Sequence, residues 1–575
     1  MAELVQQHAN PDTGRDIRLL RSTNGWGIAH PIWPILAYAF ATLATRAYFL
    51  GDTIDYADSV ASRISGRDYY FWEFGHLLWR PVGFLTLRLS QPLVAYVVGD
   101  NLRSQATLVL VLLSWFSGIL SVWSLHALLR QTCRKSWLPL AMTISFMVAL
   151  SFLNYFHSGT PYVPGLSMTL LALCILNTGR NGEVLPSRAV LGGLVLAAGI
   201  CLWFPYVVIS PAVVLSPGFV HGLNRPRLLS SVKTLILAGF FTLAAYLPVA
   251  WHIGAHSPAQ FESWMRVTSG DPGNPNKGIT KAVFGFARAF VSMGNDGVLF
   301  KRYLLRDPLN PVTVFDLLKF SLWKLISFYL FLMAIVLALL TSAKGQYFLG
   351  LLFVAGFPTL AFAVYWQGGD PERYLALFPF VFWAAAVSLE ISQRAVLRWT
   401  IAGFLIVASF VNVIALSVTV IHRQQQQSAS RVNELLPNLE GRSRIVTANW
   451  QDDLVNFSRT FPFDPINRRK DLLIQSVISP GASGVERWRE SFTNSALSTI
   501  RDGGQVWLST RLWSPRPRPE WNWVEGDDPR VSWTDLYGFF SRLDVGQPIG
   551  GDDGFVLLLS SDGNKQILAD VANKK

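Results

Sequence analysis

The feature that most constrains this chain is a series of apolar stretches, each about 20 residues long and poor in charged residues. A helix of about 20 residues crosses the roughly 30 Å hydrocarbon core of a bilayer. Only helices do so within one segment, because backbone polar groups in lipid have to be satisfied internally. The composition agrees, since 51% of the 575 residues are hydrophobic and 15% are charged. The sequence therefore predicts a polytopic α-helical membrane protein.

These stretches predict about eleven transmembrane helices. They lie at 30–50, 106–129, 137–155, 162–177, 188–203, 205–220, 233–252, 317–341, 346–366, 372–391 and 398–421. Two of them are short, and the prolines Pro205, Pro211 and Pro217 make a broken helix or a re-entrant pair the alternative there. Residues 1–29 are polar and carry no cleavable signal, so the first span is expected to act as a signal anchor.

Basic residues gather in one set of short loops, which predicts the orientation. The set comprises Arg15, Arg18, Arg21, Arg130, Arg134, Lys135, Arg180, Arg188, Arg225, Arg227, Lys233, Lys344, Arg394 and Arg398. By the positive-inside rule these loops and the N-terminal segment 1–29 are cytoplasmic, and the loops 51–105, 253–316 and 367–371 face outward. The same loops account for the net charge of +12, so no nucleic-acid partner is expected.

The composition changes after Arg423, where polar residues begin to alternate with short apolar segments. Residues 444–447, 506–509 and 555–559 have the pattern of strands, and 484–500 has that of a helix. We therefore divide the chain into a transmembrane domain at 30–423 and a small extracytoplasmic α/β domain at 424–575. The lack of a targeting sequence and the compact tail favour a bacterial inner membrane. None of the three cysteines lies in the tail, so no disulfide framework is expected.

Acidic residues follow the first span at a spacing of three, as Asp52, Asp55 and Asp58. If this segment is helical, Asp52 and Asp55 share a face at the start of a helix just above the membrane. The structural alternative is capping, with Asp52 at the N-cap and Asp55 in the first turn.

Two further groups of polar residues lie on the outward side. His76 and Arg80, four residues apart, can project from one helix face, although Trp79 and Arg80 are also typical interfacial anchors. Gly369–Tyr374 opens a late span, where Asp370, Glu372 and Tyr374 also suit an ordinary helix start. Lys324, near the outer end of the span that begins at 317, is either a functional cation or a snorkelling lysine.

Together these motifs resemble the GT-C superfamily of polyprenyl-phosphate-sugar-dependent glycosyltransferases. The superfamily includes the protein O-mannosyltransferases and the bacterial aminoarabinose transferases. The residues that carry the resemblance are Asp52-Thr53-x-x-Tyr56-Ala57, His76 with Pro81, and Glu372-Arg373-Tyr374. The chain departs from the usual pattern in two ways. It has Thr53 where many members have a second acid, which would make Asp55 that acid. It also separates His76 from Pro81, where some relatives have an adjacent pair.

The resemblance implies a membrane glycosyltransferase that takes a sugar from a polyprenyl-phosphate donor to an acceptor hydroxyl on the outer side. It implies that Asp52 is the base. Asp55 would be the second acid and would hold the acceptor or a divalent cation such as Mg²⁺ or Mn²⁺. The two aspartates can exchange these roles. Arg373 is the first choice for the phosphate, because a guanidinium offers forked donors to its oxygens. His76, Arg80, Glu372, Tyr374 and Lys324 complete the expected substrate-binding set. The acceptor can be a glycan, a lipid or a protein.

Three alternatives predict different essential residues. A transporter or flippase requires ionisable residues deep in several spans. A non-catalytic scaffold that recruits an envelope partner through its tail tolerates replacement of Asp52 and Asp55. A polymerase or ligase acting on lipid-linked glycans depends on arginine and histidine without an acidic first loop.

Overall fold

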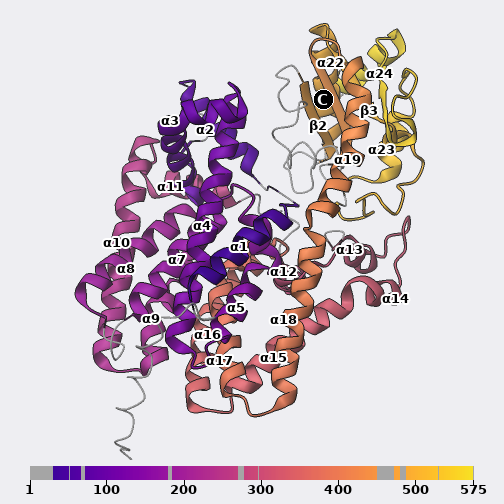
Figure 1. Cartoon of the computed structure of the whole chain (residues 1–575). Coiled ribbons are helices and arrows are strands. Elements are labelled where there is room, and N and C mark those ends of the chain that lie inside the picture. Colours follow the sequence, from indigo (N-terminus) through magenta and orange to yellow (C-terminus); the bar gives the residue numbers. More distant parts are fainter. Residues whose placement is uncertain are drawn as a thin grey trace, which may run out of the picture.

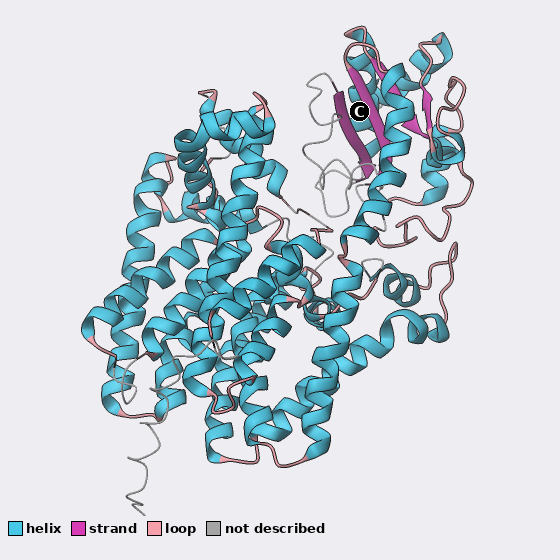
Figure 2. Ribbon diagram, viewed as in Figure 1, coloured by secondary structure: helices cyan, strands magenta, loops and turns pink. Residues whose placement is uncertain are grey.

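The helices of the transmembrane domain and a small sheet domain make up the computed structural model of the chain (Figures 1 and 2). The structure describes residues 30–48, 50, 52–66, 71–178, 184–269, 278–294, 297–449, 472–478, 487–528 and 530–573. Four basic residues used to predict the orientation, Arg15, Arg18, Arg21 and Arg180, lie outside these residues.

Eight helices among the described residues are long and apolar enough to cross a membrane. They are α3 (Trp79–Val98), α4 (Leu102–Thr132), η5 with α9 (Phe204–His221), α10 (Arg225–His252), α14 to α15 (Val314–Leu339), α16 (Ala343–Tyr365), η8 with α17 (Pro371–Ile391) and α18 (Ala395–Ala415). The shorter apolar helices are α1 (Ile32–Ala44), α5 (Leu138–Met147), α7 (Tyr162–Asn177) and α8 (Pro186–Leu202). The predicted polytopic helical fold is confirmed.

The predicted number of eleven spans is not confirmed, and the helices differ from the predicted spans in several places. The helix of the predicted span 30–50, α1, ends at Ala44. Helix α3 lies inside the segment predicted as an outer loop. The predicted span 137–155 is divided into α5 and α6 (Leu150–Tyr155), because Ala149 is extended between them. The segment 205–220 begins as the 3₁₀ helix η5 (Phe204–Ile209) and continues as α9 (Ser210–His221), which keeps Pro217 within it.

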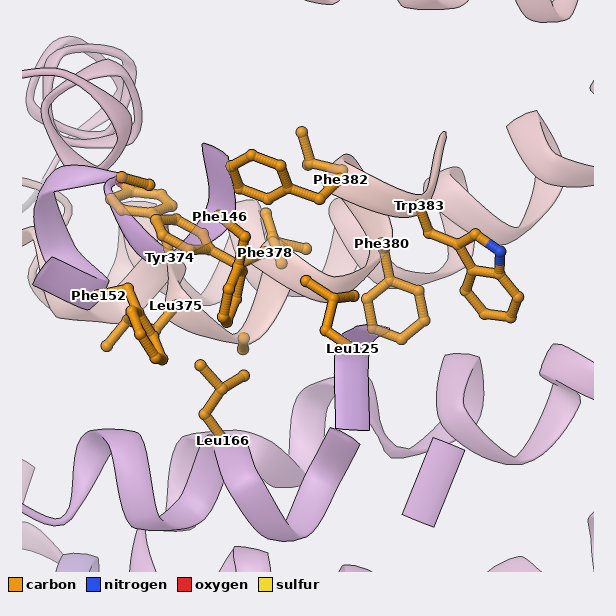
Figure 3. Packing of buried hydrophobic residues seen from close by; sticks show 14 of the residues in the cluster. Leu125, Phe146, Phe152, Leu166, Tyr374, Leu375, Phe378, Phe380, Phe382 and Trp383 are labelled. Carbon is orange, nitrogen blue, oxygen red and sulfur yellow. The ribbon is translucent and has the colours of Figure 1, made fainter. Parts of the chain in front are cut away.

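Helix α17 (Phe378–Ile391) lies at the centre of the bundle. In the most apolar part of the span Pro371–Ile391, 89% of the residues are buried, against 17% in α3 and α10. Figure 3 shows Phe378 and Phe382 of this helix packed with Phe146, and the rings of Phe146 and Phe382 are 5.7 Å apart. The segment that carries Glu372 and Arg373 therefore leads directly into the most deeply buried of the eight membrane-length helices among the described residues.

The tail forms a four-stranded sheet covered by helices, which confirms the predicted α/β domain. The strands β1 (Ser443–Asn449), β2 (Leu472–Ile478), β3 (Gln505–Ser509) and β4 (Phe555–Leu557) lie in the order β2-β1-β3-β4. The first three are parallel and β4 is antiparallel to β3. The helices include α22 (Trp488–Arg501), α23 (Trp533–Phe540) and α24 (Asp562–Asn573), and α19 (Val418–Leu435) links the sheet to α18.

A short helix of the transmembrane domain, α13 (Val298–Leu305), holds the tail domain. Arg302 donates hydrogen bonds to the carbonyl oxygens of Pro519 and Trp521 at 2.8 Å and of Trp523 at 3.1 Å. Helix α12 (Ile279–Phe290), which precedes α13, contacts the segment η8 (Pro371–Leu377). The tail is thus connected to the start of α17 through two short helices.

Candidate active site

Asp52 lies immediately before α2 (Thr53–Ile64), at the N-cap position, but its side chain makes no capping hydrogen bond. Instead its Oδ2 accepts long hydrogen bonds from the hydroxyls of Tyr56 and Tyr162, each at 3.4 Å. Both tyrosines are buried, whereas Asp52 is exposed. Two buried hydroxyls therefore hold one oxygen of the carboxylate, and the rest of the side chain is exposed. The capping alternative does not describe this side chain.

The other two acids of the segment lie near a different partner. Asp58 forms a two-pronged ion pair with Arg103 of α4, through Nε and Nη2 of the arginine. The exposed Asp55 lies close enough for its charge to act on the same guanidinium. The structure thus places Asp52 with the tyrosines and Asp55 on the side of Arg103.

Glu73 joins His76 and Arg80 just before α3. Its Oε2 accepts a hydrogen bond from Arg80 Nη1 and lies 3.3 Å from His76 Nδ1. Burial by itself raises the pKa of Glu73, but His76 and Arg80 together hold that pKa well below its usual range. The His76 Nε2 lies 3.4 Å from the hydroxyl of Tyr56, and the Arg80 guanidinium lies 4.7 Å from the centre of the Tyr56 ring. Through Tyr56 this group contacts Asp52.

The start of the late span supplies the opposite side of the site. Glu372 Oε2 accepts a hydrogen bond of 2.8 Å from the Tyr155 hydroxyl, and both side chains are buried. Arg373 donates from Nη2 to Gln367, and its guanidinium lies 5.7 Å from the centre of the Trp203 ring. Trp203 packs on Tyr162, with ring centres 4.8 Å apart.

Asp370 stands directly before this segment, among groups of both signs. Burial, followed by the charge of Glu372, raises the pKa of Asp370 to about 7, against the opposing effect of Arg373 and of Arg288 in α12. The charge of Asp52 also acts on Asp370.

Tyr162 joins the two sides. Its hydroxyl bonds to Asp52, and its ring contacts Tyr155 at 5.0 Å and Trp203 at 4.8 Å. The charges of Asp52, Asp370 and Glu372 all act on the Arg373 guanidinium. The structure therefore brings Asp52, His76, Arg80, Glu372 and Arg373 into one group, although they come from segments up to about 300 residues apart.

Three buried nitrogens of this group have no hydrogen-bond partner within the described part of the chain: His76 Nδ1, Arg80 Nε and Arg373 Nε. An unsatisfied buried donor is costly, and more so when it carries charge. The two arginines lie beside the tyrosines that hold Asp52, since Arg80 stacks on Tyr56 and Arg373 on the tryptophan that packs against Tyr162. The arrangement matches what an anionic ligand requires.

Two predicted residues are engaged elsewhere. The hydroxyl of the buried Tyr374 donates to the carbonyl oxygens of Ala282 and Gly368, at 2.9 and 2.7 Å. Lys324 donates to the carbonyl oxygen of Ser292 at 2.9 Å and lies 5.7 Å from the ring of its neighbour Trp323. Tyr374 thus ties the start of α17 to α12, and Lys324 ties α15 (Trp323–Leu339) to the end of α12.

The motifs did not identify Glu73, Tyr155, Tyr162, Trp203 or Arg288. A signal was present only for Glu73, which lies three residues before His76 and seven before Arg80. The others come from distant segments that only the fold brings to the site.

No group of three or more His, Cys, Asp or Glu side chains among the described residues is placed to hold a metal ion. Asp52 and Asp55, the predicted pair, lie toward different partners, so they do not form a ligand set by themselves.

No protein-family model and no curated protein sequence matches the chain. Solved structures do match. The structure of ArnT from Cupriavidus metallidurans bound to undecaprenyl phosphate matches with a TM-score of 0.49 and 10% identity, over 94% of this chain and 99% of that one. The archaeal oligosaccharyltransferase AglB from Archaeoglobus fulgidus, in complex with an inhibitory peptide and a dolichol-phosphate, matches with a TM-score of 0.40 and 11% identity, over 84% and 69%. At these identities the similarity concerns the fold alone.

Proposed function

We propose that the protein is a membrane glycosyltransferase that uses a polyprenyl-phosphate sugar as donor, on the outer side of the membrane. The observation that carries this proposal is the exposed carboxylate of Asp52 near two arginines whose Nε atoms lack an acceptor in the described residues. Arg80 Nε and Arg373 Nε are buried donors without a partner in the described residues, and Asp52 is held between the tyrosines that those two arginines flank. A phosphate would satisfy these donors, and Asp52 would accept the proton of a hydroxyl.

The chemistry follows from these positions. Asp52 takes the proton of the acceptor hydroxyl as its oxygen bonds to the anomeric carbon of the sugar. The bond between that carbon and the phosphate oxygen breaks, and the polyprenyl phosphate leaves with the bonding electrons. Arg373, Arg80 and His76 stabilise the charge that develops on the phosphate, so no proton is needed on the leaving group. Direct displacement inverts the configuration at the anomeric carbon.

The hydrogen bonds of Asp52 support a role as base. Two long hydroxyl contacts orient the carboxylate but leave it weakly bonded, and such contacts shorten when substrate closes a site. Asp55 lies near Arg103 in this arrangement, and we assign it an electrostatic contribution to the acceptor side rather than the proton transfer. The aromatic rings of Tyr155, Tyr162 and Trp203 pack on one another between Asp52 and the Glu372–Arg373 segment.

The test is release of undecaprenyl phosphate from a panel of undecaprenyl-phosphate sugars. The protein is purified in lipid nanodiscs, and a glycan and lipid extract of a bacterial envelope serves as acceptor. We expect release by the wild type and loss of at least about 100-fold in Asp52→Asn, in line with removal of a general base. Asp58→Asn, which alters an acid of the same helix that is paired with Arg103, is the matched control.

Equal rates in Asp52→Asn and the wild type would overturn the proposal. Donor binding without any release, together with movement of the lipid across the bilayer, would favour a flippase instead.

A further inference from the structure

Glu73 contacts both of the basic side chains that lie next to Tyr56, His76 and Arg80. One oxygen, Oε2, receives the hydrogen bond of Arg80 Nη1 and lies 3.3 Å from His76 Nδ1. His76 and Arg80 are 8% and 5% exposed, so these charges are largely removed from water. Breaking such a buried pair by removing one partner is far more costly than breaking an exposed one.

The contacts of His76 make Glu73 relevant to the base. A carboxylate beside Nδ1 favours a proton on that nitrogen and fixes the orientation of the ring. With the ring in this orientation, Nε2 faces the Tyr56 hydroxyl, 3.4 Å away. The same hydroxyl donates to Asp52 Oδ2, so the position of the ring bears on the contact that holds Asp52.

Arg80 is held by the same carboxylate. Because Nη1 is bonded to Glu73, the guanidinium is fixed above the Tyr56 ring at 4.7 Å, and its Nε is left without an acceptor in the described residues. A free arginine side chain would lose much of its rotamer entropy on binding an anion, and a guanidinium that is already fixed avoids this cost.

We propose that Glu73 is a positioning residue of the transferase. It orients His76, and through His76 and Tyr56 it sets the hydrogen bonding of Asp52. It also fixes Arg80 for the departing phosphate. This inference rests on the proposed function, and it adds a residue that neither touches the reacting atoms nor belongs to the motifs.

The experiment measures kcat and the KM for the acceptor in undecaprenyl phosphate release by Glu73→Gln, with Asp58→Asn as control. Asp58 also pairs with an arginine in the first outward segment, but its partner Arg103 lies outside the His76 group. Removal of the Glu73 carboxylate lowers kcat by about 10- to 100-fold, as for other groups that orient a ligand or base from behind. A residue that acts through the base and the leaving-group contacts lowers kcat more than it raises the KM for the acceptor, whereas a general loss of structure changes both. Asp58→Asn keeps the wild-type kcat and KM.

The outcomes separate this inference from the proposed function. If the wild type releases no polyprenyl phosphate, the proposed function fails before any variant is compared. If the wild type is active and Asp52→Asn is not, but Glu73→Gln has the wild-type kcat, the role of Glu73 is refuted. An equal loss of kcat in Asp58→Asn also refutes it, because the effect would then be general to this segment.

His76→Gln keeps the test decisive if Glu73→Gln does not yield folded protein. Glutamine retains a donor near Glu73 but lacks the ring that faces Tyr56, so kcat should also fall. A wild-type kcat in His76→Gln contradicts the proposal. Where both single variants fold, the loss of kcat in the double variant should be smaller than the product of the two single losses, since Glu73 acts in part through His76.

Discussion

Replacement of Arg302 by alanine should release the tail domain from the transmembrane domain. The Arg302 side chain is 4% exposed, and that of Asp307, 3.6 Å from its Nε, is 0% exposed. Arg302 also donates to three backbone oxygens of the tail segment 519–523. The variant leaves a buried carboxylate without its cation and removes the donor of three hydrogen bonds between domains.

The magnitude follows from burial. Removing one partner of a buried ion pair costs about 3–5 kcal/mol, because the remaining charge is not compensated. Asp307 keeps hydrogen bonds from the amides of Leu309 at 2.9 Å and Asn310 at 3.2 Å, which favours the lower end of that range. About 3 kcal/mol corresponds to roughly a 100-fold rise in the population of the undocked tail.

The neighbouring lysine provides a matched control. Lys301 pairs with Asp527 of the tail at 2.8 Å, but the two side chains are 32% and 22% exposed. An ion pair that water still reaches contributes about 0–1 kcal/mol. Lys301→Ala should therefore raise undocking about fivefold at most.

Hydrogen exchange measured by mass spectrometry on the purified full chain reports the difference. The amides of Trp521 and Asp527 are bonded within the docked segment, to Arg518 and Val524. Their exchange should accelerate about 100-fold in Arg302→Ala and only slightly in Lys301→Ala. Equal exchange in both variants would refute the reasoning that burial decides the strength of this contact.

Two further predictions concern buried carboxylates at the site. Tyr155→Phe removes the 2.8 Å hydrogen bond to Glu372 and should lower the unfolding midpoint by the equivalent of about 1.5–3 kcal/mol. Tyr162→Phe should lower the midpoint less, because the hydrogen bond from Tyr162 to Asp52 is 3.4 Å long. Equal midpoints in the two variants would contradict this. For Asp370 the folded pKa of about 7 lies above the usual value, so its contribution to stability is present below about pH 4 and is lost as the pH rises toward 7. Asp370→Asn should therefore gain thermal stability relative to the wild type between pH 5 and 8, as unfolding scans across that range would show, and a constant difference across it would contradict the assignment.

Hydropathy predicted the membrane helices well because it measures the property that lipid selects. It missed α3 because Arg80, Arg88 and Pro92 interrupt the apolar residues of that helix. It also missed the break between α5 and α6, where the carbonyl oxygen of Val148 accepts a hydrogen bond from Asn412, 264 residues away in the chain. Contacts at such separations are not encoded in any local pattern.

The candidate site shows the same division. Short motifs led to Asp52, His76, Arg80 and Arg373, and these residues do lie in one group. A motif does not specify in which direction a side chain points. Tyr374 and Lys324 were therefore included in the predicted site, although their polar atoms bond to backbone carbonyls elsewhere. The partners that hold the site together, such as Tyr155 for Glu372, come from segments in which no motif marks the residue.

The central claim is that Asp52 removes a proton and does not hold the donor. The most direct measurement compares Asp52→Asn with the wild type in two assays on the same nanodisc preparation: the affinity for undecaprenyl phosphate, and the single-turnover rate of sugar transfer. We predict that the affinity of the variant for undecaprenyl phosphate is within about twofold of that of the wild type or higher, because a carboxylate that repels phosphate has been removed. We also predict that its rate of sugar transfer falls by at least about 100-fold. A variant that transfers sugar at the wild-type rate, or that fails to bind undecaprenyl phosphate, would contradict the claim.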